Sequence, residues 1–206
     1  MASPASSGSG DPLGVSRIGY LERYLATSAD TLRKLPVAAI DGVIAALVQA
    51  LEAERFVYVM GNGGSAANAE HFVNDLGKGG MRGFPRRFKV LSLTSNVSLM
   101  TAWANDTAYD QVFAEQLRNF VGRGDVVMAI SGSGNSPNVL NAMTLARANG
   151  AVTVGLTGGD GGKLKPLCDH CVLVASDDMQ HIEELHLVVL HAIYSAIRDT
   201  CMPPEA

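Results

Sequence analysis

The chain has 206 residues, 47% of them hydrophobic, which suits one domain of ordinary size with a substantial core. Its formal net charge is −4 and no run of Lys or Arg occurs, so we expect no nucleic-acid-binding surface. No stretch reaches the about 18 consecutive apolar residues of a membrane-spanning helix, so we expect no membrane span.

The segment 1–14, MASPASSGSGDPLG, lacks the basic head and apolar middle of a secretory signal. We interpret it as a disordered leader or a cloning remnant, and we expect one domain over residues 15–206.

Three cysteines are too few for a disulfide framework and indicate a reducing compartment, the cytoplasm. Cys168 and Cys171 form a CxxC pair ahead of an apolar stretch. We interpret this pair as buried or incidental, because a redox or zinc role needs further ligands or a helix start after a strand.

Five short β-rich runs follow one another along the chain. They are nearly continuously apolar rather than alternating, which is typical of strands buried on both faces of a parallel sheet. The runs are 55–60, 88–93, 126–131, 151–156 and 171–175.

Apolar residues at helical spacing lie before, between and after these runs. The predicted helices are 16–33, 36–54, 65–78, 108–121, 135–149 and 179–199. Alternating β and α units predict an α/β doubly wound fold. We expect the helices at the two ends of the chain to cover the sheet or to pair with another subunit.

Glycine-rich loops follow the first, third and fourth runs, at the strand ends where open α/β sheets bind ligands. They are GNGGSAAN (61–68), SGSGNSPN (131–138) and TGGDGGK (157–163). Glycine lets backbone N–H groups approach an anion, hydroxyls donate further hydrogen bonds, and a following helix start adds a favourable dipole. One such loop is weak evidence, because glycine is common in turns. Two serine-rich loops at strand ends together predict a phosphate cradle.

These loops do not match the nucleotide-binding motifs. Neither serine-rich loop ends in the Lys-Ser/Thr of a P-loop, and the first lacks the third glycine of GxGxxG. The expected ligand is therefore a small phosphorylated metabolite.

Two helices carry histidine together with a carboxylate. His71 and Asp75 are four residues apart and share a helix face, and Glu183 and His191 lie on roughly one side of the last helix. Each pair alone is more often a structural histidine and a solvated acid. The last helix, however, is strongly apolar, so its polar positions indicate proton transfer or a divalent metal.

Five motifs in chain order together resemble the SIS (sugar isomerase) domain family, in particular its phosphoheptose isomerases. They are GNGGSAANAEHF, ANDTAYDQVF, ISGSGNSPNV, LTGGDGGKL and IEELHLVVLH, over about residues 16–199. The resemblance implies a flavodoxin-like, doubly wound five-stranded parallel sheet flanked by helices. It also implies a homotetramer with active sites at subunit interfaces, and aldose–ketose isomerisation of a sugar phosphate through an enediol. Some members hold zinc there, so we expect zinc or another divalent metal, one per active site.

The resemblance assigns roles by position. Substrate contacts fall on Asn62, Gly63, Gly64, Ser65, Asn105, Asp106, Ser131, Gly132, Ser133, Ser136 and Glu183. The serines of the third loop resemble the family's phosphate-binding serines. The expected metal ligands are His71, Asp75, Glu183 and His191, and the expected catalytic set is Glu183, His191 and Asp75.

Three of these positions depart from the family pattern. Asp75 stands where the family has glutamate, its proposed base, Glu183 where it has glutamine, and Gly132 where it has threonine. Lys78 lies one residue from the place of a family arginine. Two carboxylates and two imidazoles fit zinc, manganese or iron. Because aspartate is shorter than glutamate, we predict that Glu183 takes the carbon proton; the alternative is that both acids only hold metal, with His191 or a bound water moving it.

The substrate that the resemblance implies is sedoheptulose 7-phosphate, with D-glycero-D-manno-heptose 7-phosphate as the product. An isomerase of a pentose or hexose phosphate and a non-catalytic phosphosugar-sensing or adaptor protein are the alternatives. An adaptor needs no His–carboxylate pairs, and this chain keeps both of them, which favours an enzyme.

Overall fold

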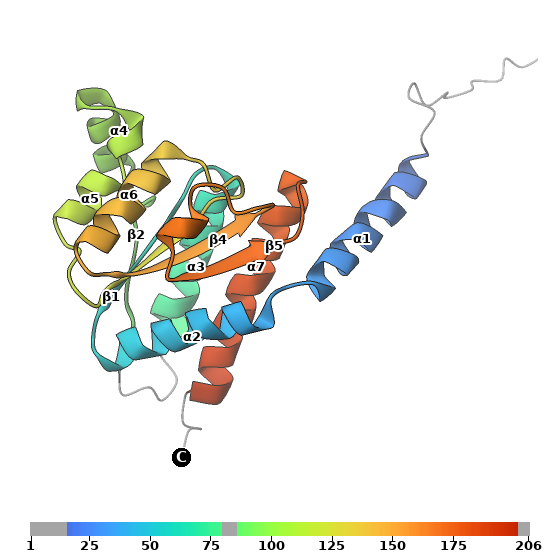
Figure 1. The fold of residues 1–206 in the computed structure, drawn as a ribbon, viewed down its shortest axis with the longest axis horizontal. Coiled ribbons are helices and arrows are strands. Elements are labelled where there is room, and N and C mark those ends of the chain that lie inside the picture. Colours follow the sequence, from blue (N-terminus) through green and yellow to red (C-terminus); the bar gives the residue numbers. More distant parts are fainter. Residues whose placement is uncertain (1–15, 80–85, 202–206) are drawn as a thin grey trace, which may run out of the picture.

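The computed structural model describes residues 16–79 and 86–201. Its centre is a sheet of five parallel strands in the order β2-β1-β3-β4-β5, with helices on both faces (Figure 1). The predicted α/β class and five-stranded parallel sheet are confirmed. The leader expected over residues 1–14 lies outside the described residues.

All five strands begin and end within two residues of their predicted bounds. They are β1 Phe56–Gly61, β2 Lys89–Ser92, β3 Val126–Ile130, β4 Val152–Gly158 and β5 His170–Val174. Alternate residues face opposite layers: in β1, Val57 and Val59 join one hydrophobic cluster, and Tyr58 and Met60 join the other. Both faces are therefore apolar, as the continuous runs predicted.

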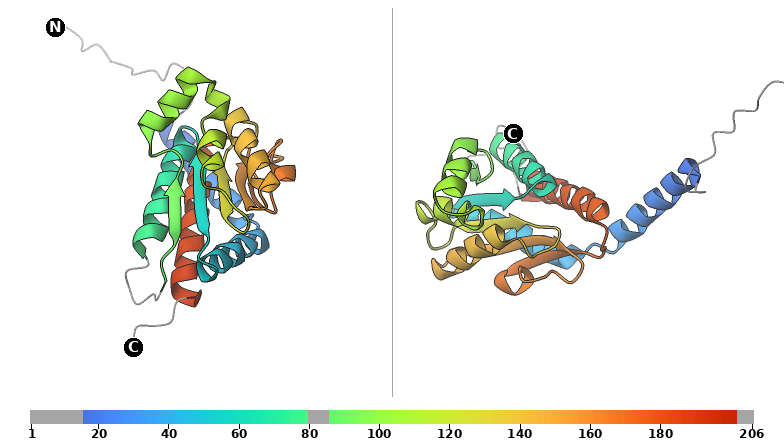
Figure 2. Two further views of the ribbon diagram at one scale, coloured as in Figure 1. Left: turned by 90° about the vertical axis from the view of Figure 1, so that its left-hand side faces the viewer. Right: turned by 90° about the horizontal axis from the view of Figure 1, so that it is seen from above.

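The described part of the chain has seven α-helices. They are α1 Arg17–Arg33, α2 Val37–Glu52, α3 Gly64–Gly79, α4 Val97–Asp106, α5 Ala114–Arg118, α6 Pro137–Ala148 and α7 Met179–Ala196. Side chains of α2, α3 and α7 form the core on one face, and those of α5 and α6 form the core on the other, with α4 at its margin (Figure 2). The sheet thus presents its carboxyl edge between two helical layers.

The single helix predicted over 108–121 is wrong. A short 3₁₀ turn at Tyr109–Gln111 precedes α5, and α4 was not predicted. Val112, Phe113 and Ala114 are consecutive and all buried, which is broader than the apolar stripe of one amphipathic helix. In α4 no residue is fully buried, and its apolar residues pack only partly against the core.

Helix α1 projects from the rest of the molecule (Figures 1 and 2). Of its residues only Thr31 is buried. No single helix in the described part of the chain is long and apolar enough to span a membrane, whereas α1 and α2 pass that test only as a pair, bent by 65° at their junction.

His186 of α7 is fully buried, and neither ring nitrogen has a hydrogen-bond partner among the described residues. Burial lowers the pKa of His186 to about 4, because the apolar core disfavours the charged imidazolium. His186 is therefore neutral in the folded protein at neutral pH.

The free energy of unfolding should fall as the pH drops from about 6.5, the ordinary histidine pKa, to about 4, because the unfolded chain takes up a proton that buried His186 does not. The free energy of unfolding is unaffected by the titration of His186 above pH ~6.5. It is lower by about 3 kcal/mol near pH 4. Urea unfolding across this pH range measures it, and His186→Leu should flatten the profile. Equal slopes for the variant and the parent protein would contradict the assignment.

Candidate active site

Two serine-rich loops meet at the carboxyl edge of the sheet, where β1 and β3 end side by side. We call residues 61–68 the first loop and residues 131–138 the phosphate loop. The chain leaves β1 for β2 on one side and returns to β3 on the other, so the winding direction reverses between these loops. A crevice at such a reversal is where open α/β sheets bind ligands.

Amide hydrogen bonds fasten the first loop to the phosphate loop. Asn62 Nδ2 donates to Asn138 Oδ1, and Asn138 Nδ2 donates back to Asn62 Oδ1, both at 2.9 Å. The Tyr109 hydroxyl donates to the same Asn62 oxygen at 3.0 Å. Because Asn138 is buried, this pair fixes the separation of the two loops.

The phosphate-loop hydroxyls surround the start of α6. Ser131 is buried, and its Oγ lies 3.4 Å from Ser136 Oγ. Ser136 is the N-cap residue of α6 but makes no capping hydrogen bond, so its hydroxyl is not committed to the helix. The exposed Ser133 hydroxyl accepts from the Asn135 N–H at 3.2 Å. Together with the first-turn N–H groups and the dipole of α6, these hydroxyls are donors of the kind that anions bind. Buried Ser65, in the first turn of α3, belongs to the first loop.

Ser133→Ala and Ser136→Ala should each weaken the binding of phosphate by about 1–3 kcal/mol, the cost of leaving a charged acceptor short of a donor. Calorimetric titration with inorganic phosphate measures the change. Thr144→Ala is the matched control, since it removes a hydroxyl from the exposed side of the same α6 helix. Unchanged affinity in both serine variants would contradict the role of this loop.

Glycines let neighbouring groups approach the first loop and the phosphate loop closely. Gly63 has φ +55°, a left-handed conformation that favours glycine. A methyl group on Gly132 would lie 2.4 Å from Met179 Sδ, so the threonine of the family pattern would require Met179 to move. A methyl group on Gly64 would lie 2.3 Å from a carboxylate oxygen of Glu183.

The Glu183 carboxylate therefore sits against the first residue of α3. Asn68 of α3 donates from Nδ2 to the Glu183 carbonyl oxygen at 3.0 Å, which ties the start of α7 to α3. The positive end of the α3 dipole favours a carboxylate at this place. Glu183 is half-buried and lies beside the first loop.

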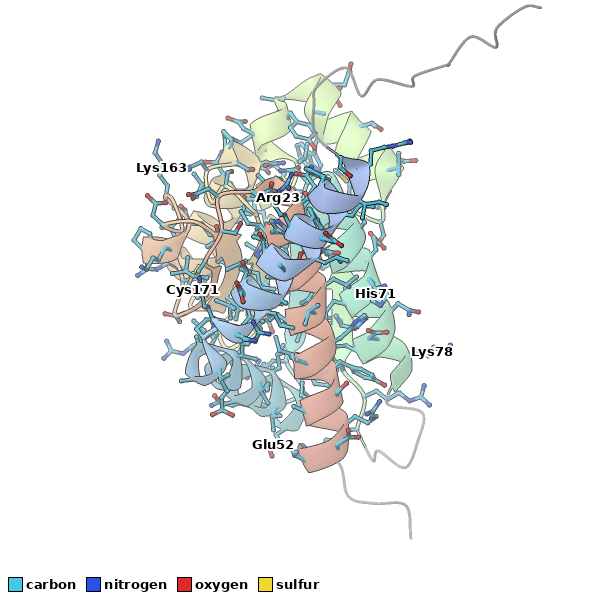
Figure 3. The ribbon with its side chains drawn as sticks, turned by 90° about the vertical axis from the view of Figure 1, so that its right-hand side faces the viewer. Arg23, Glu52, His71, Lys78, Lys163 and Cys171 are labelled. Atoms are coloured by element: carbon cyan, nitrogen blue, oxygen red, sulfur yellow. The ribbon has the colours of Figure 1, made fainter. Side chains whose placement is uncertain are left out.

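A second group gathers further along the same two helices. His71 Nε2 lies 2.8 Å from His191 Nε2, and Asp75 Oδ2 lies 3.5 Å from the first and 3.8 Å from the second. Ligand atoms of these three residues all lie within 4.8 Å of one another. Figure 3 shows His71 on α3, facing α7 at the surface of the chain. Glu183 is not a member of this group in the structure.

Asn105 and Asp106, both predicted as substrate contacts, are joined to each other by a hydrogen bond. Both are exposed at the carboxyl end of α4, where Asn105 Nδ2 donates to Asp106 Oδ1 at 2.9 Å. In the part of the chain that the structure describes, no hydrogen bond joins either side chain to the first loop or the phosphate loop.

Sequence reasoning missed three polar residues that support the site. Tyr109 and Asn138 form hydrogen bonds with Asn62. Both residues stand within the motifs quoted above, but no role was assigned to them. Glu70, which precedes His71, accepts hydrogen bonds from the hydroxyls of Ser92, Thr94 and Ser95. Burial alone raises the pKa of Glu70, but these hydroxyls together lower it below its ordinary value. Glu70 thereby fixes α3 to the loop after β2.

Comparison with known proteins shows that the chain is similar to one group of enzymes. Residues 20–158 match the SIS domain model. A phosphoheptose isomerase of Aliarcobacter butzleri is 42% identical over 153 residues, 73% of this chain and 79% of that relative. One of a Bradyrhizobium species is 38% identical over 89% of this chain and 92% of its own. The solved structure of phosphoheptose isomerase GmhA from Neisseria gonorrhoeae has a TM-score of 0.82 at 30% identity, covering 88% of this chain and 98% of that one.

Proposed function

The chain belongs to the SIS domain family, and we propose that it is a phosphoheptose isomerase, an aldose–ketose isomerase that converts sedoheptulose 7-phosphate to D-glycero-D-manno-heptose 7-phosphate. The observation that carries this proposal is the contact of the Glu183 carboxylate with Gly64 of the first loop. A proton acceptor thus lies beside the first loop, at the same edge of the sheet as the phosphate loop and its serine hydroxyls. Relatives named phosphoheptose isomerase, 38% and 42% identical over most of the chain, support the same substrate.

The reaction needs two proton transfers that these residues can divide. Moving the carbonyl from C2 to C1 requires a base that removes a proton from C1 and returns it to C2, and a second group that moves a proton between the two oxygens. We assign the carbon proton to the Glu183 carboxylate and the oxygen proton to His191. The phosphate is remote from the reacting carbons, and its binding energy holds the sugar in a reactive pose.

The donor set of His71, Asp75 and His191 fits a divalent metal ion. Two imidazole nitrogens and a carboxylate oxygen converge within 4.8 Å, and this combination suits zinc, with manganese or iron as alternatives. We assign one ion per active site to these three residues, and we assign Glu183, which lies outside this group, to proton transfer instead. When bound, the ion would polarise the substrate carbonyl and stabilise the negative charge that develops on its oxygen.

Incubation of the metal-loaded protein with single sugar phosphates, followed by NMR, tests the function. We expect sedoheptulose 7-phosphate to give the aldoheptose phosphate, and pentose and hexose phosphates to react far more slowly. Faster conversion of a pentose or hexose phosphate would reassign the substrate. Phosphate binding without conversion of any sugar would instead favour a phosphosugar sensor or adaptor.

We also assign the enzyme to the cytoplasm. Cys168 and Cys171 are free thiols although they are neighbours in the fold. Free thiols are usual in a reducing compartment.

We propose a homotetramer in which α1 packs against other copies of the chain. Ile18, Leu21 and Leu25 are 56–70% exposed and are spaced as one apolar stripe along α1. An exposed stripe of this kind marks a protein–protein contact. His71 and His191 are also exposed in the single chain, which supports active sites at subunit interfaces.

Light scattering at micromolar concentration should give the mass of four chains. The double variant Leu21→Glu, Leu25→Glu should give a smaller species, because charges in the stripe oppose its burial. Glu22→Gln is the matched control on the exposed part of the same helix. A monomeric mass for the unmodified protein would contradict the assembly.

A further inference from the structure

Cys168 and Cys171 lie together on one face of the sheet edge, away from the candidate active site. Cys171 of the edge strand β5 pairs with Gly155 of β4. A methyl group on Gly155 would lie 2.5 Å from Cys168 Sγ and 3.6 Å from Cys171 Sγ, so both sulfurs occupy the space that this glycine leaves. Both thiols are free and half-buried. In Figure 3, Cys171 and His71 lie on opposite sides of α7.

The surroundings of the pair distinguish its two thiols. The neighbouring Cys168 thiol lowers the pKa of Cys171, and Lys165 lowers it further while burial opposes the shift. The same contact raises the pKa of Cys168, with burial and Asp169 acting in the same direction and Arg147 against them. Cys171 is thus the better nucleophile, since the thiolate is the reactive form.

We infer that Cys168 and Cys171 are a reversible dithiol–disulfide site, oxidised by a low-molecular-weight disulfide such as oxidised glutathione. The Cys171 thiolate attacks one sulfur of the oxidant, forming a mixed disulfide and releasing one glutathione thiolate. The Cys168 thiol gives its proton to solvent and attacks the Cys171 sulfur, which releases the second glutathione. Two protein thiols are oxidised, and one glutathione disulfide is reduced to two thiols.

A chain of hydrogen bonds connects this pair to the phosphate loop. Cys168 Sγ donates to the Leu164 carbonyl oxygen at 3.2 Å. The Leu164 N–H donates to the Gly134 carbonyl oxygen at 2.9 Å. The Gly134 N–H in turn donates to the Ser131 carbonyl oxygen at 3.0 Å. Oxidation removes the thiol proton and with it the first bond of the chain. This link, unlike the disulfide itself, rests on the proposed phosphate-binding role of residues 131–138.

Mass spectrometry of the full chain tests the disulfide. In a Cys201→Ser background, treatment with oxidised glutathione should yield a species lacking two hydrogen atoms, with Cys168 and Cys171 joined in one peptide. Cys168→Ser and Cys171→Ser should each prevent it. Dithiothreitol should restore the starting mass. Stable glutathione adducts on the two thiols, or no reaction, would overturn the assignment.

Inorganic phosphate binding tests the link to the phosphate loop. Cys168→Ala removes the donor to Leu164, and oxidised protein lacks it too, so both should bind phosphate about threefold to tenfold more weakly. Cys168→Ser keeps a hydroxyl donor and should bind phosphate as the reduced parent protein does. Equal affinity of Cys168→Ala, Cys168→Ser and the parent would overturn the link. The affinity for inorganic phosphate is measured without isomerase turnover. The test therefore remains valid even if the enzyme acts on a different sugar.

Discussion

Replacing Glu183 by glutamine should lower the turnover of sedoheptulose 7-phosphate by about 100- to 10,000-fold, the usual contribution of a positioned general base. The substitution is nearly isosteric, so the contact with Gly64 and the Asn68 hydrogen bond to the Glu183 main chain are kept. It also places the family's glutamine at this position. The loss therefore reports the missing proton acceptor rather than a changed shape. Measurements of turnover, of substrate affinity and of metal content separate these effects.

Glu184 provides the matched control for this experiment. It is the next residue of α7, and its carboxylate accepts hydrogen bonds from the hydroxyls of Tyr24 and Ser28 of α1 and lies 3.0 Å from His181 Nδ1. Glu184→Gln makes the same chemical change away from the crevice and should leave turnover within a few-fold of the parent enzyme. If Glu183→Gln retains metal, substrate affinity and near-parental turnover, Glu183 is not the base, and His191 or a bound water moves the carbon proton.

The strands were predictable because each is buried on both sides. Every residue of β3, Val126–Ile130, is apolar and buried, so no alternation competes with the strand interpretation. Helix α4 could not be predicted in the same way. Its Met100 and Trp103 are only partly buried at the margin of the core, and the start of the helix depends on Asn96, whose side chain accepts from the Leu99 N–H. A cap of this kind is weak evidence in a single sequence.

The members of the candidate site were easier to predict than their grouping. A spacing of eight residues places Glu183 and His191 on roughly one side of α7, but it also separates them by about 12 Å along the helix axis. Glu183 therefore reaches the first residue of α3, and His191 reaches His71 two turns later. Only the packing of α3 against α7 reveals this separation. Tyr109 was missed for a similar reason, since its partner Asn62 lies 47 residues earlier in the chain.

Replacing Asp75 by asparagine should remove the metal rather than the base. Asp75 Oδ2 faces the Nε2 atoms of both His71 and His191, and it supplies the negative charge of that group. Loss of an outer partner of a metal site already costs about 10- to 100-fold in affinity, so loss of this charged ligand should cost at least as much. Metal content after dialysis, and affinity for zinc alone by competition with a chelator, measure the effect without reference to turnover.

Asp75→Glu is the control, because it keeps the carboxylate and places the family's residue at this position. It should retain the metal, whereas Asp75→Asn should lose it and Glu183→Gln should keep most of it. Such a pattern divides the roles, with Asp75 holding the ion and Glu183 moving the proton. Full metal occupancy in Asp75→Asn together with a collapse of turnover would reverse the division and make Asp75 the base. Comparable metal loss in Asp75→Asn and Glu183→Gln would show that both carboxylates are ligands, and the proton acceptor would then have to be sought at His191.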